Sequence, residues 1–177
     1  EEKLPASERM LGVQLWLNLP AKDKMVPPEY HSIKNAEIEE IEIDHGKLRL
    51  LAGEYDGRSG YQSKYLPLNY YDIHLNARGS IEIPTSQDDS VMVFTLLGDA
   101  IIGDVLIKEK TAVKLSSGDI FTIKATDEKS QVLFISSKAL AEPIAWGGPI
   151  VMNTKEELNK AFDDLSQGTF LQDKISY

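Results

Sequence analysis

The chain has 177 residues, with 19 lysines and arginines against 28 aspartates and glutamates, a formal net charge of −9 and no cysteine. This length predicts one domain, or at most a domain plus an appendage, with a hydrophobic core of its own. The acid excess argues against direct binding to nucleic acid or to an anionic membrane. The lack of cysteine excludes disulfides, thiolate metal sites and cysteine nucleophiles, and it is compatible with a reducing compartment such as the cytoplasm.

Most of the chain reads as short β-strands separated by turn residues. Apolar and polar side chains alternate over residues 13–19, and the pattern stops at Pro20, which cannot donate to a β-ladder. Turn pairs such as Asp56-Gly57 and Gly98-Asp99 separate later strands. Those strands are predicted at residues 36–44, 48–52, 70–75, 80–83, 91–97, 100–107, 111–115, 120–125 and 131–135. The pattern predicts an all-β fold, an antiparallel sandwich, jelly roll or barrel.

One α-helix is predicted near the C-terminus. Thr154 can cap it, because Glu157 follows three residues later and completes a capping box. Gly168 is suited to end it. The helix carries an apolar stripe at helical spacing, made of Leu158, Ala161, Phe162 and Leu165. This stripe must be buried, either against the rest of the domain or against a partner.

The three histidines, His31, His45 and His74, form no H-x-H or H-x-x-x-H pair. Metal-binding β-barrels usually place two imidazoles two residues apart on one strand, so that both point into the lumen. This chain cannot do so. His31 and His45 are predicted to lie in loops.

The remaining candidate ligand pair is Asp72 with His74, on one strand face together with Tyr70. Two interpretations are open: a pair of metal ligands, or a solvent-facing pair. The second is favoured, because the alternating apolar positions between them have the character of the core-facing side. Those positions are Tyr71, Ile73 and Leu75. No nucleophile elbow, phosphate-binding loop or dinucleotide fingerprint is present, so the residues alone indicate no active site.

Two stretches of the chain resemble the pirin family. Residues 12–30, GVQLWLNLPAKDKMVPPEY, are similar to the family's Q-L-W-x-N-L strand and K-M-x-x-P-x-Y turn. Residues 142–170 are similar to its E-P pair, its G-P-F-V-M-N-T-x-E-E helix start and its closing D-x-x-x-G-x-F, with Ile150 in place of the usual Phe. The two motifs occur in the right order, and the resemblance covers nearly the whole chain.

Pirins contain two cupin domains, and the resemblance is to the C-terminal one. It implies a cupin or jelly-roll type antiparallel β-barrel followed by a C-terminal α-helix. It also implies a division into three parts. Residues 1–11 would be the tail of a linker from an N-terminal cupin, residues 12–152 the β-barrel, and residues 153–177 the helix and tail.

The resemblance also implies a function for the intact protein. The family's iron is held in the N-terminal cupin by an H-x-H pair and by an H-x-E pair just before the Q-L-W strand. Glu2 would be the last carboxylate ligand, while this chain alone is expected to hold no iron and no catalytic residue. The implied activity is that of a quercetin 2,3-dioxygenase. The alternative is a non-enzymatic module, a transcription coregulator or a partner of a metabolic enzyme.

The implied partners follow from the same resemblance. The missing N-terminal half would cover apolar surface on this chain, namely the strand at residues 13–19 and the helix stripe. Without that half the chain is expected to self-associate or to stay bound to it.

Overall fold

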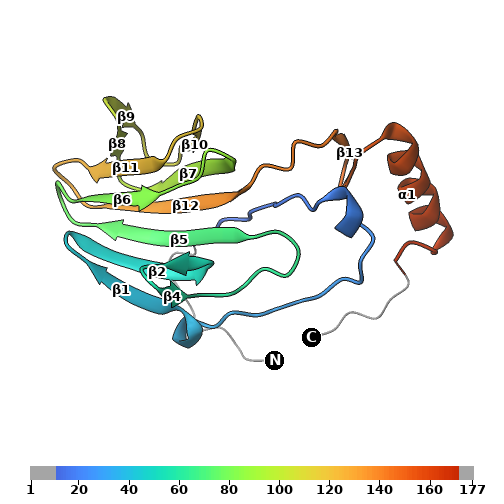
Figure 1. Cartoon of the computed structure of the whole chain (residues 1–177), viewed down its shortest axis with the longest axis horizontal. Helices are drawn as coiled ribbons and strands as arrows, with labels where there is room; N and C mark the ends of the chain where they lie inside the picture. Colours follow the sequence, from blue (N-terminus) through green and yellow to red (C-terminus); the bar gives the residue numbers. More distant parts are fainter. Residues whose placement is uncertain (1–10, 172–177) are drawn as a thin grey trace.

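The computed structural model describes residues 11–171 and shows two antiparallel sheets around one core, with a helix at one end (Figure 1). The larger sheet has six strands in the order β1-β2-β5-β12-β7-β10. Their bounds are Glu39–Ile43 (β1), Gly46–Ala52 (β2), Leu68–Leu75 (β5), Asp89–Leu97 (β7), Ala112–Lys114 (β10) and Ser130–Lys138 (β12). The smaller sheet has the order β6-β11-β8-β9. Its strands are Ser80–Pro84 (β6), Ala100–Ile102 (β8), Val105–Ile107 (β9) and Ile120–Ala125 (β11).

Period-two alternation puts the apolar side chains of both sheets into a shared core. On β5 the alternate residues Tyr71, Ile73 and Leu75 are almost wholly buried, as predicted. Aromatic rings fill the middle of this core: Phe134 stacks on Tyr71 at a centroid distance of 5.3 Å and lies 5.3 Å from Phe121. The space between the sheets is therefore a packed interior.

The C-terminal helix α1 (Lys155–Gln167) packs on a two-stranded hairpin, β13 (Ala145–Gly147) with β14 (Ile150–Met152). The predicted cap is confirmed: Thr154 Oγ1 accepts from Glu157 N, and Glu157 Oε2 accepts from Thr154 N. Gly168 ends the helix with a left-handed φ of 70°, which suits glycine.

The apolar stripe of α1 is only partly covered within the described chain. Ala161 is buried against Ile150 and Met152, and Leu158 packs beside it. Two members of the stripe remain open, with Phe162 38% and Leu165 51% exposed. The helix end of the molecule therefore carries apolar surface that residues 11–171 do not cover.

The predicted all-β fold with a C-terminal helix is confirmed, but its strands form two larger sheets and two short hairpins, and no closed barrel is assigned among the described residues. The strand predicted at residues 100–107 is two strands, because Gly103 turns the chain with a φ of 58°. A 3₁₀ turn at Asn35–Glu37 replaces the start of the strand predicted at residues 36–44. A short hairpin was not predicted as strands: β3 (Glu54–Tyr55) with β4 (Arg58–Ser59).

The prediction of a β-strand at residues 13–19 is wrong, because these residues form no backbone hydrogen bonds with another strand of the described chain. Residues 11–20 have no assigned secondary structure and belong to no sheet. Alternation reports which side chains are apolar, whereas a strand also needs a neighbouring backbone with which to pair. A 3₁₀ turn at Ala21–Asp23 follows, close to the hairpin and α1, and the chain then runs back to β1 (Figure 1). Within residues 11–171 no helix has the length and apolar character needed to span a bilayer.

Candidate functional site

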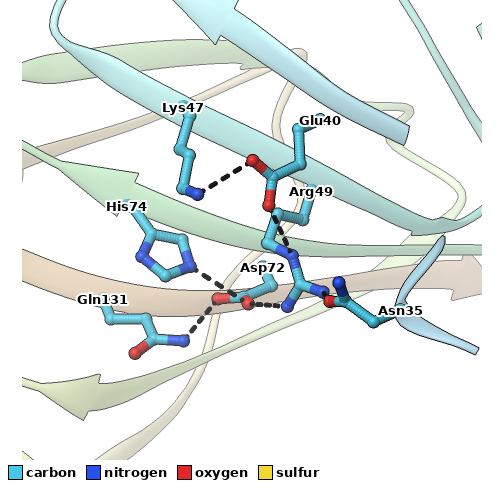
Figure 2. A network of polar contacts seen from close by, with 7 residues as sticks. All are labelled: Asn35, Glu40, Lys47, Arg49, Asp72, His74 and Gln131. Atoms are coloured by element: carbon cyan, nitrogen blue, oxygen red, sulfur yellow. Dashed lines mark hydrogen bonds and ion pairs between the residues drawn. The ribbon is translucent and has the colours of Figure 1, made fainter. Parts of the chain in front are cut away.

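A network of polar side chains lies on the outer face of the larger sheet, opposite to the core-facing residues of β5 (Figure 2). Strand register builds it, since Arg49 on β2 pairs with Asp72 on β5, one row away from the paired His74 and Gln131. We call this group the Asp72 network. Its members are Asn35, Glu40, Lys47, Arg49, Asp72, His74 and Gln131.

Asp72 is the centre of the network and is only 5% exposed. Its Oδ2 accepts hydrogen bonds from Arg49 Nη1 and His74 Nε2, each at 3.1 Å, and its Oδ1 accepts from Gln131 Nε2 at 2.8 Å. The prediction that Asp72 faces solvent is therefore wrong. β5 is a central strand, so neighbouring strands on both sides supply side chains that cover its outward residues.

The hydrogen bonds decide the ionisation of Asp72. Burial opposes the charged form and acts to raise the pKa, but hydrogen bonds from His74, Gln131 and Arg49 outweigh it and hold the pKa of Asp72 below its ordinary value. The carboxylate is thus charged at neutral pH, with its oxygens taken up by donors from three strands.

The network continues towards the edge of the sheet. Arg49 also donates from Nη2 to Asn35 Oδ1 at 2.6 Å and lies with Nε 3.2 Å from Glu40 Oε1. Lys47 Nζ donates to Glu40 Oε2 at 2.9 Å, and this bond holds the pKa of Glu40 below its usual value. Arg49 therefore spans two carboxylates and locks β1, β2 and β5 together on this face.

A shallow pocket of about 430 Å³ borders the network at the turn end of the sheet. Lys47, His74 and Gln131 belong to both, and the side chain of His74 is about one-third exposed. The other lining residues are Glu42, Gly46, Leu75, Asn76, Leu97, Lys129 and Ser130. The hydroxyl of Ser130 is buried without a hydrogen-bond partner in the described chain.

The donor set of this face does not suit iron. Arg49 lies beside Asp72, and a fixed guanidinium repels a cation. The lone pairs of Asp72 already accept three hydrogen bonds. Within residues 11–171 no three His, Cys, Asp or Glu side chains are grouped so that they could bind a metal. The hydrogen bonds and ion pairs of the network instead join β1, β2, β5 and β12.

The structure keeps the three histidines apart. His31 lies in the long connection before β1 and stacks on Tyr61, with ring centroids 4.9 Å apart. His45 lies in the β1–β2 turn, where its carbonyl accepts from Asn76 N at 2.8 Å. Both loop assignments are confirmed. Glu2, the implied metal ligand, lies outside the described residues.

A second polar group joins the two sequence motifs. Glu142 Oε2 accepts from Ala21 N at 2.8 Å and from Asn153 Nδ2 at 3.0 Å, and Lys24 Nζ donates to Asn18 Oδ1 at 2.7 Å. We call these five residues, Asn18, Ala21, Lys24, Glu142 and Asn153, the Glu142 cluster. Burial lowers the pKa of Lys24, against the attraction of Glu142 and Glu157. The cluster ties the first motif to the start of α1.

Sequence reasoning missed Arg49 and Gln131 in the Asp72 network. They lie 23 and 59 residues from Asp72 in the chain, and only strand pairing brings them to it. No local motif marks either residue. The residues of the Glu142 cluster all come from the two stretches singled out above. The sequence did not predict, however, that these residues contact one another.

Comparisons with known proteins agree on one family. A model of the pirin C-terminal cupin domain matches residues 70–171. Pirin of Homo sapiens is 32% identical over 169 aligned positions, a match that covers 92% of this chain and 58% of pirin. A Pseudomonas aeruginosa protein named as a candidate quercetin 2,3-dioxygenase is 32% identical, with 90% of this chain and 57% of that protein covered.

The fold leads to the same relatives. A crystal structure of quercetin 2,3-dioxygenase from Acinetobacter baumannii matches with a TM-score of 0.81 and 33% identity, covering 88% of this chain and 55% of that one. The chain thus spans little more than half the length of the relatives it matches.

Proposed function

The chain belongs to the pirin family, and from that premise we propose that it is the C-terminal cupin of a two-cupin, non-haem iron protein with quercetin 2,3-dioxygenase activity. The observation that carries the proposal is the likeness to the Acinetobacter baumannii quercetin 2,3-dioxygenase, in both sequence and fold. About half of that chain lies outside the match, which leaves room for another domain. We further propose that the intact protein is cytoplasmic, as the lack of cysteine favours.

In this proposal the iron belongs to the preceding cupin. The outer-face carboxylate Asp72 is unsuited to a metal, because Arg49 lies beside it and three donors occupy it. The carboxylate that this chain would contribute is Glu2, which precedes the first motif in sequence. When bound, the iron would supply a centre with open positions for substrate and dioxygen.

The test uses the longer protein that includes the residues preceding Glu1. It should retain about one iron after dialysis and consume oxygen with quercetin. Glu2→Ala should remove most of the iron, because a mononuclear site depends on each of its few ligands. Elemental analysis and an oxygen electrode measure both outcomes.

Two variants serve as controls for Glu2→Ala: one removes a neighbouring negative charge, and the other removes a histidine that is not a proposed ligand. Glu1→Ala removes the adjacent carboxylate, and His74→Ala removes the histidine bound to Asp72. Both should keep the iron content of the unmodified protein. A full equivalent of iron on the 177-residue chain by itself, lost in His74→Ala, would overturn the assignment.

A second function, a non-enzymatic interaction module, is favoured by exposed apolar residues at the helix end. Trp146 on β13 is 69% exposed, and Phe162 and Leu165 on the adjoining helix α1 are 38% and 51% exposed. Exposed apolar surface is typical of protein–protein contacts. A longer, iron-loaded protein that consumes no oxygen with quercetin, yet binds a protein partner stably through this end, would favour the module over the enzyme.

A further inference from the structure

The β8–β9 hairpin projects from the smaller sheet at the end of the molecule remote from α1 (Figure 1). β9 is the last strand of that sheet, and within residues 11–171 it pairs with β8 alone. All three of its residues are apolar, and Val105 and Leu106 are 61% and 50% exposed. Apolar edge strands are normally covered or paired, because an open one is a template for another strand. The hairpin therefore has the properties of an interaction surface, separate from residues 13–19 and from the stripe of α1.

The register of the hairpin determines which backbone groups of β9 are free. Its turn consists of residues 103–104, and Ile102 pairs with Val105 beside the turn. In a two-residue hairpin the residues that flank the turn exchange both of their backbone hydrogen bonds, and bonded and non-bonded pairs then alternate along the strands. Val105 and Ile107 therefore direct their N–H and C=O groups at β8, whereas Leu106 directs its own away from β8. Among the three residues of β9, only Leu106 can bond to a further strand.

The same register fixes how a second copy of the chain can pair with this edge. A two-fold axis perpendicular to the sheet keeps every side chain on its own face, so antiparallel pairing of β9 with itself must be centred on one residue. That residue is Leu106, because it alone has outward backbone groups. Leu106 then faces the Leu106 of the second copy, and Val105 faces the second copy's Ile107. Apolar residues of β9 therefore oppose only apolar residues on both faces of the joined sheet.

The residues that flank β9 carry complementary charges in this register. Asp104 lies two residues before Leu106 and Lys108 two residues after it, so Asp104 of each copy faces Lys108 of the other. Asp104 is exposed, and its carboxylate has no hydrogen bond or ion pair within residues 11–171. Lys108 Nζ donates to Asp99 Oδ2 at 2.7 Å, but the Lys108 side chain is 71% exposed and can bind a second carboxylate. Self-pairing would therefore form one ion pair at each end of the contact.

We propose that the β9 edge is a homodimer interface, at which two copies of this chain pair antiparallel about Leu106 and join their smaller sheets into one. Leu106 of each copy donates to and accepts from Leu106 of the other. An ion pair between Asp104 and Lys108 closes each end. A second copy is the partner because the edge is complementary to itself, in backbone groups, in apolar side chains and in charge. The proposal does not depend on the proposed function.

Two features of the molecule make this dimer weak and reversible. A ladder of three-residue strands buries little surface, and each copy carries a net charge of −9, which repels the other copy at long range. We expect a dissociation constant above about 1 μM, with a dimer at high protein concentration that dissociates on dilution. Added salt should strengthen the dimer at first, because it screens the overall repulsion. Sedimentation equilibrium of the 177-residue chain measures this association.

A charge exchange tests the register. Asp104→Lys places like charges opposite one another at both ends of the contact and should weaken dimerisation about 10-fold. Combining Asp104→Lys with Lys108→Asp restores opposite charges, and should recover part of the affinity although Asp99 loses its partner. Glu128→Lys is the matched control, since Glu128 is exposed in the turn between β11 and β12. It changes the net charge from −9 to −7, as Asp104→Lys does, but should not weaken the dimer.

Amide hydrogen exchange locates the contact on β9. The amide of Leu106 should exchange at least about 10-fold more slowly in the dimer than after dilution, while the amides of Val105 and Ile107, bonded to β8, keep the same protection. Leu106→Pro removes the outward donor without removing a bond to β8, and should abolish dimerisation. Leu106→Ala keeps that donor, and should dimerise more tightly than the proline variant.

Three results would overturn the proposal. The first is a chain that stays monomeric up to about 1 mM, which would leave this edge to a partner other than a second copy. The second is a dimer whose affinity Asp104→Lys lowers no more than Glu128→Lys does. The third is a dimer that forms without slowing the exchange of the Leu106 amide. The last two results would place the contact elsewhere, for example at residues 13–19 or at the stripe of α1.

Discussion

The Asp72 network and the Glu142 cluster hold different kinds of structure together. The Asp72 network joins strands that are already hydrogen-bonded, and its central carboxylate is almost completely buried. The Glu142 cluster joins pieces of chain that share no ladder, the segment before Ala21 and the start of α1. The comparison teaches that the family motifs in this chain serve mainly to position a segment, whereas the buried charge stabilises the sheet.

Removing Asp72 should have the largest effect. In Asp72→Ala the guanidinium of Arg49 loses its buried counter-charge, and the free energy of unfolding should fall by about 3 kcal/mol. Urea denaturation followed by circular dichroism measures the change. Asp127→Ala is the matched control, because Asp127 pairs with Arg78 at 2.7 Å but both side chains are largely exposed. That variant should lose less than about 0.5 kcal/mol. Equal losses of stability in both variants would mean that the burial of Asp72 does not increase its contribution to stability over that of the exposed Asp127.

Glu142→Ala should have an intermediate effect on stability. Two donors, Ala21 N and Asn153 Nδ2, lose an ionised acceptor, so we expect a loss of about 1.5 kcal/mol. The exposed Glu128→Ala should be neutral. Hydrogen exchange adds a local measurement: the amide of Ala21 should exchange faster, while amides in β5 stay unchanged. Faster exchange throughout β5 would show that the cluster supports the sheet as well.

Thr154→Ala tests the helix that the Glu142 cluster borders. The variant loses the hydroxyl that accepts from Glu157 N, and the expected cost is about 1 kcal/mol. Thr154→Ser keeps the hydroxyl and should stay close to the unmodified protein in its melting temperature. A Thr154→Ala variant with the same melting temperature as the unmodified protein would refute the assigned start of α1.

The smallest expected effect is the contribution of Asp72 to the pH dependence of the free energy of unfolding, which is seen only at acidic pH. Because the folded pKa of Asp72 lies below its ordinary value of 3.8, ionised Asp72 favours the folded state above that value. This contribution is lost as the pH falls from about 3.8 through the lower folded pKa. Asp72→Asn should therefore show a shallower fall in the free energy of unfolding over this acid range. Parallel curves for the two proteins would mean that other carboxylates dominate acid unfolding.

Local patterns predicted the parts of the fold that depend on neighbours in sequence. The helix cap at Thr154 and the core-facing side of β5 both follow from spacings of a few residues, and both are confirmed. The partners of Asp72 could not be predicted in this way, since they depend on which strands flank β5. Residues 13–19 show that local pattern also fails to predict strand pairing. Their apolar residues alternate as in a β-strand, yet within the described chain no other backbone segment pairs with them.

The exposure of both tryptophans determines what the intrinsic fluorescence of this protein can report. Trp16 and Trp146 are the only two indoles in the chain, and they are 56% and 69% exposed. Their fluorescence should thus resemble that of indole in water even in the native state and change little on unfolding, since the aromatic core contains only tyrosine and phenylalanine. The same emission would shift to the blue when another surface covers either ring. Intrinsic fluorescence of this chain is a reporter of docking, and its unfolding is better followed through the backbone.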